Sequence, residues 1–129
     1  MTIEMVMVED SREIISAIED LLAPDGRFRI VGRNATENEA TAWLQEHPHD
    51  WDLAVIDLVL RDGSGFNVVR RYREANETAR IVVLSDYATL NIKLRCVELG
   101  ADAVFTKGEF KAFIAYVSSI RPRGASLHA

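Results

Sequence analysis

The chain has 129 residues, of which 48% are hydrophobic and 27% are charged, and its formal net charge is −5 at pH 7. This length suits one domain with a single hydrophobic core, and the composition argues against intrinsic disorder. The negative charge excludes a global positive field, and no apolar run approaches the roughly 20 residues that cross a bilayer, so we expect no direct nucleic-acid binding and no membrane association.

Five short apolar runs along the chain predict five strands. They lie at residues 3–8, 28–31, 53–56, 81–84 and 103–105. The first, third and fourth runs are rich in Val, Ile, Leu and Met and barely alternate between apolar and polar residues. Strands that are buried on both faces of a parallel sheet have this composition.

A stretch with helical spacing of its apolar residues follows each predicted strand. These stretches lie at residues 14–22, 40–44, 66–72, 90–99 and 110–117. Ser11 stands where a helix N-cap belongs, and Gly100 stands where a helix C-cap glycine belongs. The alternation predicts an α/β fold, a single (βα)5 doubly wound domain whose five-stranded parallel sheet carries helices on both faces.

We expect this domain to occupy residues 1–121. Residues 122–129 contain Pro122 and Gly124 and lack apolar periodicity, so we expect a short flexible tail and no output domain in this chain. Cys96 is the single cysteine and cannot form an internal disulfide. A reducing, cytoplasmic location is therefore the expectation.

Polar residues follow the predicted strands at the sheet edge where ligands bind in such folds. Glu9 and Asp10 follow the first strand, Asp57 the third and Ser85 the fourth, and Lys107 lies just beyond the fifth. Three clustered carboxylates repel one another, and a hard divalent cation such as Mg²⁺ relieves that repulsion. A carboxylate can also attack a phosphoryl group, helped by an ammonium charge and a hydroxyl donor. The pattern therefore indicates cation-dependent phosphoryl chemistry.

Other polar residues have simpler interpretations. The basic run at residues 70–73 is followed by Glu74 and Glu77, which favours a solvated helix face over a nucleic-acid contact. His47 and His49 lie in a predicted loop with no further His or Cys nearby, so we interpret them as solvated rather than as metal ligands.

The residues at the strand ends resemble the motifs of receiver domains of two-component response regulators, whose chemotaxis-type members have a flavodoxin-like fold. The matching segments are Val8-Glu9-Asp10, residues 57–65, Val83-Leu84-Ser85 and residues 100–107. The resemblance covers residues 3–120 and implies the strand order 2-1-3-4-5.

The resemblance implies specific roles at the acidic edge. Asp57 would accept a phosphoryl group from a histidine kinase or a phosphotransfer protein. Mg²⁺ or Mn²⁺ would be held by Glu9, directly or through water, by Asp10, by Asp57 and by the backbone carbonyl of Val59. Such a protein would be no turnover enzyme, but it would assist its own phosphorylation and dephosphorylation.

The resemblance also implies a switch. Ser85 and Lys107 would bind the phosphoryl group, and Ser85 together with Phe105 or Tyr87 would change position in response. The face formed by the fourth helix, fifth strand and fifth helix, residues 88–120, would then change its binding of a downstream protein or of a second copy.

Four positions depart from the usual pattern of the family. Arg61 and Gly108 stand where proline is common, Asp86 where a small residue is common, and Val104 where the switch aromatic usually lies. Asp86, Val104 and Gly108 keep one alternative open, a degenerate receiver that acts as a phosphorylation-independent protein-interaction module.

Two other functions on the same fold are disfavoured by single positions. A flavodoxin-like cofactor protein would need a phosphate-binding loop where this chain has Glu9 and Asp10, which repel phosphate. A phosphatase with an aspartyl-phosphate intermediate would need a second acid two residues after Asp57, and Val59 cannot transfer a proton.

Overall fold

Five parallel strands form one sheet in the order β2-β1-β3-β4-β5. The strands are β1 (Ile3–Val8), β2 (Phe28–Asn34), β3 (Leu53–Ile56), β4 (Arg80–Ser85) and β5 (Ala103–Thr106). This computed structural model describes residues 2–121, and the tail predicted at residues 122–129 lies outside the described part. The predicted fold class and strand order are confirmed.

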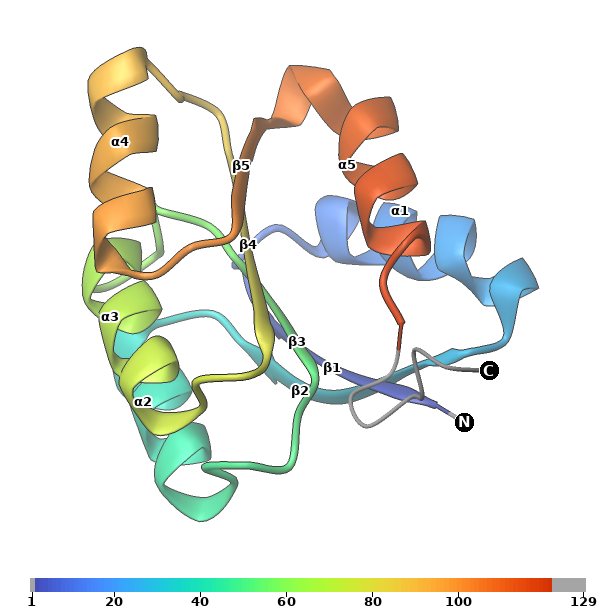
Figure 1. Ribbon diagram of the computed structural model, residues 1–129, viewed down its shortest axis with the longest axis horizontal. Coiled ribbons are helices and arrows are strands. Elements are labelled where there is room, and N and C mark those ends of the chain that lie inside the picture. Colours follow the sequence, from blue (N-terminus) through green and yellow to red (C-terminus); the bar gives the residue numbers. More distant parts are fainter. Residues whose placement is uncertain (1, 122–129) are drawn as a thin grey trace.

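Helices cover both faces of the sheet, as Figure 1 shows. They are α1 (Arg12–Leu22), α2 (Glu37–Glu46), α3 (Gly65–Ala75), α4 (Leu90–Leu99) and α5 (Phe110–Ser118), with 3-10 turns η1 (Ala23–Asp25) and η2 (Lys107–Glu109). Helices α1 and α5 lie on one face, and α2, α3 and α4 lie on the other. In the part of the chain that the structure describes, none of these helices has the length and apolar character needed to span a bilayer.

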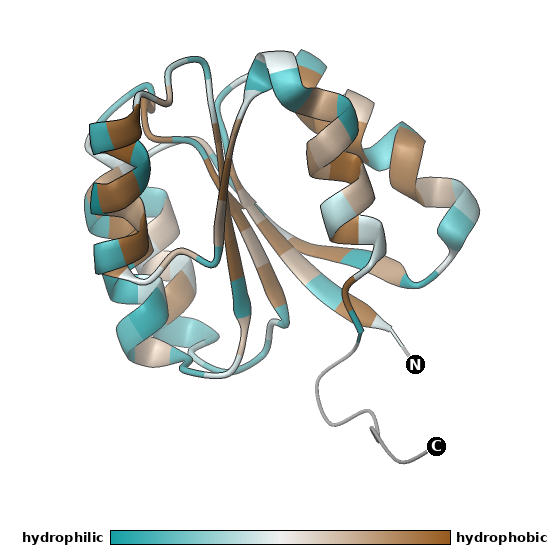
Figure 2. Cartoon of the chain, turned by 45° about the horizontal axis from the view of Figure 1, so that its top comes forward, coloured by the Kyte–Doolittle hydropathy of each residue, from teal (hydrophilic) through white to brown (hydrophobic). Residues whose placement is uncertain are grey.

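Each face of the sheet has its own hydrophobic core. Trp51 and Tyr72 are fully buried in the core beneath α2, α3 and α4, and Phe113 is fully buried in the core beneath α1 and α5. Every residue of β3 is buried, because helices cover both of its faces. Figure 2 shows hydrophobic segments along the central strands and a mixture of hydrophobic and hydrophilic residues on the helices. Burial of this surface is the main favourable term in folding.

Side-chain caps start three of the helices close to the ends of the preceding strands. The Ser11, Thr36 and Thr89 side chains accept hydrogen bonds from backbone N–H groups in the first turns of α1, α2 and α4. Gly100 ends α4 in the left-handed conformation, with φ of 118°. The predicted cap roles of Ser11 and Gly100 are confirmed.

Strand β2 is longer than the sequence predicts. It runs to Asn34 rather than ending at residue 31, because an edge strand accepts polar residues that a buried strand excludes. The pairing register shifts once, since Met5 pairs with Ile30 and Val6 pairs with Gly32. The shifted strand brings Asn34 beside Val8 at the carboxyl edge of the sheet.

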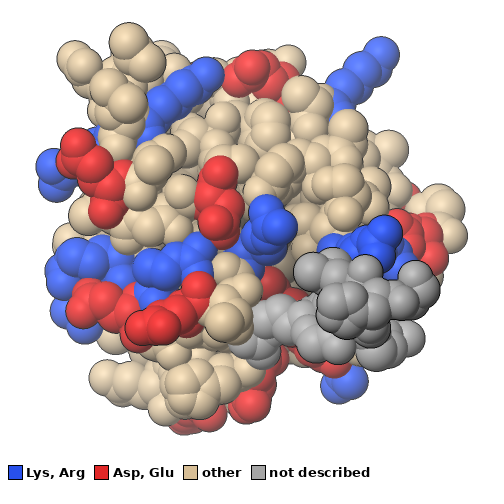
Figure 3. All heavy atoms as spheres, viewed as in Figure 1, with Lys and Arg blue, Asp and Glu red and all other residues tan. Residues whose placement is uncertain are grey.

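Arg73 corrects the interpretation of the basic run as a solvated face. Its guanidinium donates hydrogen bonds to several backbone carbonyls and to the carboxylate of Asp102 at 2.7 Å. The carbonyls are those of Gly100, Asn76, Glu77 and Ala79. Arg70 instead lies on the surface and pairs with Glu74 at 3.3 Å, and Figure 3 shows basic and acidic side chains intermixed on this side of the molecule.

We expect Arg73→Met to lower the free energy of unfolding by about 2–3 kcal/mol, because it leaves several carbonyls and the Asp102 carboxylate without their donor. Arg70→Met is the matched control on the same helix, and its loss should stay within about 0.5 kcal/mol because its ion pair is exposed. Urea unfolding of both variants measures the difference. Equal stabilities would contradict the structural role of Arg73.

Candidate functional site

The carboxyl ends of the central strands bring three acidic side chains together. Glu9 and Asp10 follow β1, and Asp57 follows β3, the strand paired with β1. One carboxylate oxygen from each residue lies within 4.8 Å of the others. The chain connects β1 first to β2 on one side and later to β3 on the other, so the cluster lies where the strand order reverses. Ligands bind at this position in doubly wound sheets.

Lys107 lies between two of these carboxylates. Its Nζ is 3.1 Å from Oε1 of Glu9 and 3.1 Å from Oδ2 of Asp57. Both acidic side chains are 4% exposed, and that of Lys107 is 16% exposed. The three charges are therefore shielded from water, which strengthens their interaction.

The turn η2 fixes the backbone of Lys107. Thr106 and Glu109 form a capping box, in which the Thr106 side chain accepts from the backbone N–H of Glu109 and the Glu109 carboxylate accepts from that of Thr106 at 3.0 Å. The Thr-x-x-Glu spacing in the sequence is the signal from which this motif can be predicted. With Gly108 in place of the usual proline, the capping box holds the loop that begins with Lys107.

The crowding of carboxylates changes the proton affinity of Glu9. Burial, followed by the neighbouring charge of Asp57, raises the pKa of Glu9 from 4.5 to about 7. Burial acts to lower the pKa of Lys107, but hydrogen bonds and charges from Asp57 and Glu9 outweigh it and raise that pKa. Lys107 therefore remains an ammonium at neutral pH, while one ammonium does not fully compensate the acidic cluster.

The loop after β3 is built to approach Asp57 closely. The Val59 N–H donates to Oδ1 of Asp57 at 3.2 Å, and a Cβ on Gly65 would collide with the backbone carbonyl of Asp57. Glu37 of α2 fastens the same loop by accepting from the Ser64 N–H at 2.8 Å. These contacts hold the carboxylate of Asp57 toward Lys107. No residue with a side chain fits at position 65 without a shift of the backbone.

The remaining predicted residues lie around this cluster at different depths. Ser85 is 1% exposed at the end of β4, next to β3, and pairs in register with Thr106 of β5. Phe105 packs toward α5, with its ring centroid 6.1 Å from that of Phe113. Tyr87 is 72% exposed on the loop before α4. The structure therefore places one aromatic candidate against the core and the other in solvent.

The donor set fits a divalent cation. It consists of carboxylate oxygens only, it is preformed within 4.8 Å, and it includes the exposed Asp10 at its mouth. Hard cations such as Mg²⁺ take a few carboxylates and keep several waters. Burial and, after it, the negative charge of Asp57 raise the pKa of Glu9, and a divalent cation would offset both effects.

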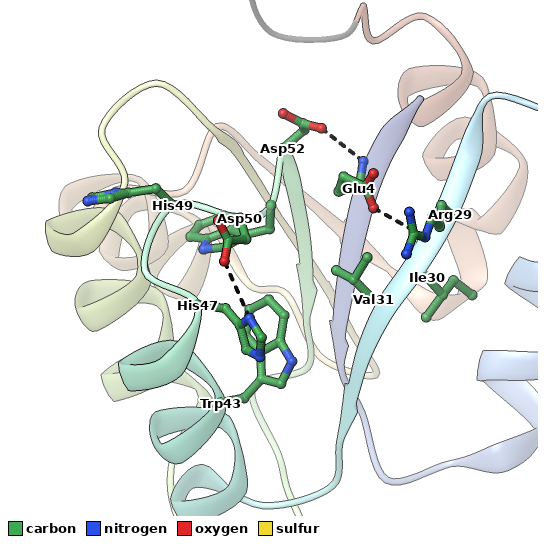
Figure 4. A pocket seen from close by; sticks show the side chains of 10 residues that line it. Glu4, Arg29, Ile30, Val31, Trp43, His47, His49, Asp50 and Asp52 are labelled. Atoms are coloured by element: carbon green, nitrogen blue, oxygen red, sulfur yellow. Dashed lines mark hydrogen bonds and ion pairs between the residues drawn. The ribbon is translucent and has the colours of Figure 1, made fainter. Parts of the chain in front are cut away.

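A hollow of about 640 Å³ lies at the opposite end of the sheet, and the residues that line it do not form a group with the spacing of a metal site. Figure 4 shows its wall, where His47 stacks on Trp43 with ring centroids 4.6 Å apart and contacts Asp50 at 3.4 Å. Among the described residues, the acidic group Glu9, Asp10 and Asp57 alone has the spacing of a metal site, so neither His47 nor His49 joins such a group.

Comparison with known proteins assigns most of the chain to the family that its sequence motifs resemble. The profile of the family described as response regulator receiver domain matches residues 5–117. Among curated relatives, the transcriptional regulatory protein CusR of Escherichia coli K12 is 34% identical over 79 residues, 60% of this chain and 35% of CusR. The photosynthetic apparatus regulatory protein RegA of Cereibacter sphaeroides is 29% identical over 103 residues, 80% of this chain and 54% of RegA. The chain thus spans about a third to a half of the length of these relatives.

Solved structures share the fold at lower identity. The BeF3-activated DrrB receiver domain is 21% identical with a TM-score of 0.75, covering 91% of this chain and 95% of that one. The CheX–CheY–BeF3–Mg²⁺ complex of Borrelia burgdorferi contains a chain that is 16% identical with a TM-score of 0.78, covering 92% of this chain and 90% of that one. These similarities concern the fold.

The raised pKa of Glu9 predicts a specific pH dependence of the metal-free protein. Between pH 4.5 and about 7 the folded state keeps a proton on Glu9 that the unfolded chain has released, so stability should fall as the pH rises through this window. The full loss should be about 3 kcal/mol. Urea unfolding of wild type and Glu9→Gln across this range measures it, because the variant cannot titrate there. If the free energies of unfolding of the two proteins changed in parallel with pH, the prediction would be contradicted. Addition of Mg²⁺ should restore the stability that the wild type has lost at pH 7.

Proposed function

We propose, from the premise that this chain belongs to the response regulator receiver domain family, that Asp57 accepts a phosphoryl group in a reaction that needs a divalent cation. One observation carries the proposal: Lys107 Nζ lies 3.1 Å from both Glu9 and Asp57 at the acidic edge. A half-buried ammonium beside a carboxylate nucleophile favours transfer of a negatively charged group.

In the proposed reaction a carboxylate oxygen of Asp57 attacks the phosphorus of the donor. A P–O bond to Asp57 forms as the bond from phosphorus to the donor breaks, and the leaving group keeps that electron pair. The leaving atom is the imidazole nitrogen of a histidine kinase or phosphotransfer protein, or the carboxylate oxygen of an acyl phosphate. Lys107 stays charged and stabilises the negative oxygens of the transferred group.

Mg²⁺ or Mn²⁺ would be held by the carboxylates of Glu9, Asp10 and Asp57 and by the backbone carbonyl of Val59. When bound, the cation neutralises charge that develops on the phosphoryl oxygens. The crowded carboxylates, of which Glu9 has its pKa raised to about 7, support this role because they lack a second positive partner among the described residues. The buried thiol of Cys96 fits a reducing cytoplasm.

The phosphorylated protein acts as a switch rather than as a turnover enzyme, since the product remains on Asp57 until it is hydrolysed. We expect Ser85 to respond first, because it is buried at the end of β4, which pairs with β3, the strand that Asp57 follows. A hydrogen bond from its hydroxyl to the phosphoryl group would pull on the loop that carries Tyr87 and leads into α4. Phe105, packed toward α5, lies on the neighbouring strand.

The output face of the proposal is residues 88–120, and α4 gives it an apolar centre. Leu90, Leu94 and Val97 are 72%, 53% and 56% exposed. Their spacing places them on one side of the helix, and Tyr87 precedes them on the adjoining loop. Contiguous exposed apolar side chains mark protein contacts, so we propose that a downstream protein or a second copy docks here.

Phosphorylation tests the proposal directly. On incubation with acetyl phosphate and Mg²⁺, intact mass should show one phosphoryl group on wild type and none on Asp57→Asn, because the amide is no nucleophile. EDTA should abolish the reaction. Asp62→Asn is the matched control, since it alters an exposed acid of the same loop and should leave the modification unchanged.

Two results would contradict the site assignment. Modification of Asp57→Asn at the wild-type rate would place the phosphoryl group elsewhere. An unmodified wild type under these conditions would favour the degenerate receiver, which binds partners without phosphorylation.

The output face has its own test by sedimentation velocity. Fully phosphorylated wild type should sediment faster than the unmodified protein, through a second copy or an added partner, and Leu94→Ser should abolish that shift by removing apolar contact area. Leu21→Ser is the matched control, because Leu21 of α1 is equally exposed at 53% but lies across the sheet from α4. Both variants should accept phosphate at the wild-type rate. No change in sedimentation or partner binding under full phosphorylation counts against the face.

A further inference from the structure

Asn34 is a buried polar residue beside the acidic cluster to which no role has been assigned. It ends β2, and it pairs in register with Val8, the residue before Glu9. Its backbone carbonyl accepts the N–H of Glu9 at 2.9 Å. Its side chain is 8% exposed, yet the Nδ2 atom has no hydrogen-bond partner. Such an unsatisfied buried group costs about 1–3 kcal/mol and calls for an explanation.

The side chain of Asn34 lines a hollow that opens onto the proposed metal ligands. The hollow has a volume of about 410 Å³, and Glu9 and Asp10 form part of the same wall. A water molecule occupies about 30 Å³ of liquid, so the space admits a hydrated ion with several of its waters. Mg²⁺ keeps such waters, and each of them needs acceptors for its two O–H groups.

Few groups around this hollow can accept those hydrogen bonds. Arg12, Arg33 and Arg61 also line it, but a guanidinium has donors only. Two of them already have acidic partners, since Arg33 lies 3.1 Å from Glu19 and Arg61 lies 3.8 Å from Glu39. Apart from the ligand carboxylates, the side-chain acceptors on this wall are Ser16, Glu39 and Asn34.

Asn34 is the buried one of these three acceptors. Ser16 is exposed on α1, and the carboxylate of Glu39 is 50% exposed. The Nδ2 atom is enclosed, so the amide oxygen is the end of this side chain that can meet a water in the hollow. Only the carbonyl suits a water whose lone pair points to a cation.

We propose that Asn34 is a positioning residue of the metal centre, whose amide oxygen accepts a hydrogen bond from a metal-bound water in the hollow beside Glu9 and Asp10. The inference rests on the divalent-cation site of the proposed function. Its basis is that this amide lies at the wall of the hollow beside Glu9 and Asp10 and that no hydrogen bond from the described residues holds its Nδ2 end. Hydrogen bonds to groups around a metal orient its ligands and tune its affinity.

Binding of Mn²⁺ followed by electron paramagnetic resonance tests the role without any phosphoryl transfer. Bound Mn²⁺ loses the sharp six-line signal of the free ion, so a titration gives the dissociation constant for each variant. Asn34→Ala should weaken binding about tenfold, because one water of the bound ion loses its acceptor. Asn34→Asp keeps an acceptor and adds negative charge, so it should bind Mn²⁺ at least as tightly as wild type.

Thermal unfolding of the metal-free variants separates this role from packing. Asn34→Ala removes an unsatisfied amide and should keep the wild-type melting temperature. The matched control is Asn76→Ala, since Asn76 is equally buried and donates to the Trp51 carbonyl at 3.0 Å. That variant should melt earlier and bind Mn²⁺ as wild type does. Should Asn34→Ala fail to fold, Asn34→Val fills the space without polar atoms and should show the same loss of affinity.

The outcomes distinguish this inference from the proposed function. Wild-type protein that does not bind Mn²⁺ would overturn the metal centre and with it the role of Asn34. Wild-type binding with equal dissociation constants for Asn34→Ala or Asn34→Val would overturn the role of Asn34 alone.

Discussion

The rest of the site depends on one interaction, the contact of a single ammonium group with two buried carboxylates. Lys107 lies 3.1 Å from Glu9 and from Asp57, and both acids are almost fully shielded from water. A third acid, Asp10, lies within 4.8 Å of them. One positive charge faces three carboxylates, and burial, followed by the neighbouring charge of Asp57, raises the pKa of Glu9 to about 7. A divalent cation would offset the remaining negative charge, which by itself repels a phosphoryl group.

The arrangement exists only in the folded chain, because three strands supply it. Glu9, Asp57 and Lys107 come from the ends of β1, β3 and β5, and the parallel sheet turns these distant positions toward one edge. The two cores beneath the helices hold that sheet from both faces. The close approach of Gly65 to the Asp57 backbone leaves the loop little freedom to adjust. The geometry of the site is therefore set by the packing of the whole domain.

The sequence predicted the elements and residues whose signal is local. Strand β3 is a continuous apolar run and was placed correctly, and the acids after β1 and β3 were predicted to meet because parallel strands end at one edge. The sequence could not show which polar side chains would be buried. Arg73 looked solvated because its carbonyl partners come together only in the folded chain, and Asn34 was missed because β2 seemed to end before it.

The free-energy cost of burying acidic side chains at the carboxyl edge of the sheet supports a chemical role for this edge rather than partner binding alone. Burying Glu9 and Asp57 around one lysine opposes folding, and replacing such charges by well-packed apolar residues is often neutral or stabilising. An unsatisfied amide at Asn34 adds to the same cost. A module that bound partners only through the exposed side of α4 would gain nothing from these groups, which follow β1 and β3 or end β2. Destabilising groups persist where function uses them, and a divalent cation would offset the excess negative charge of this edge.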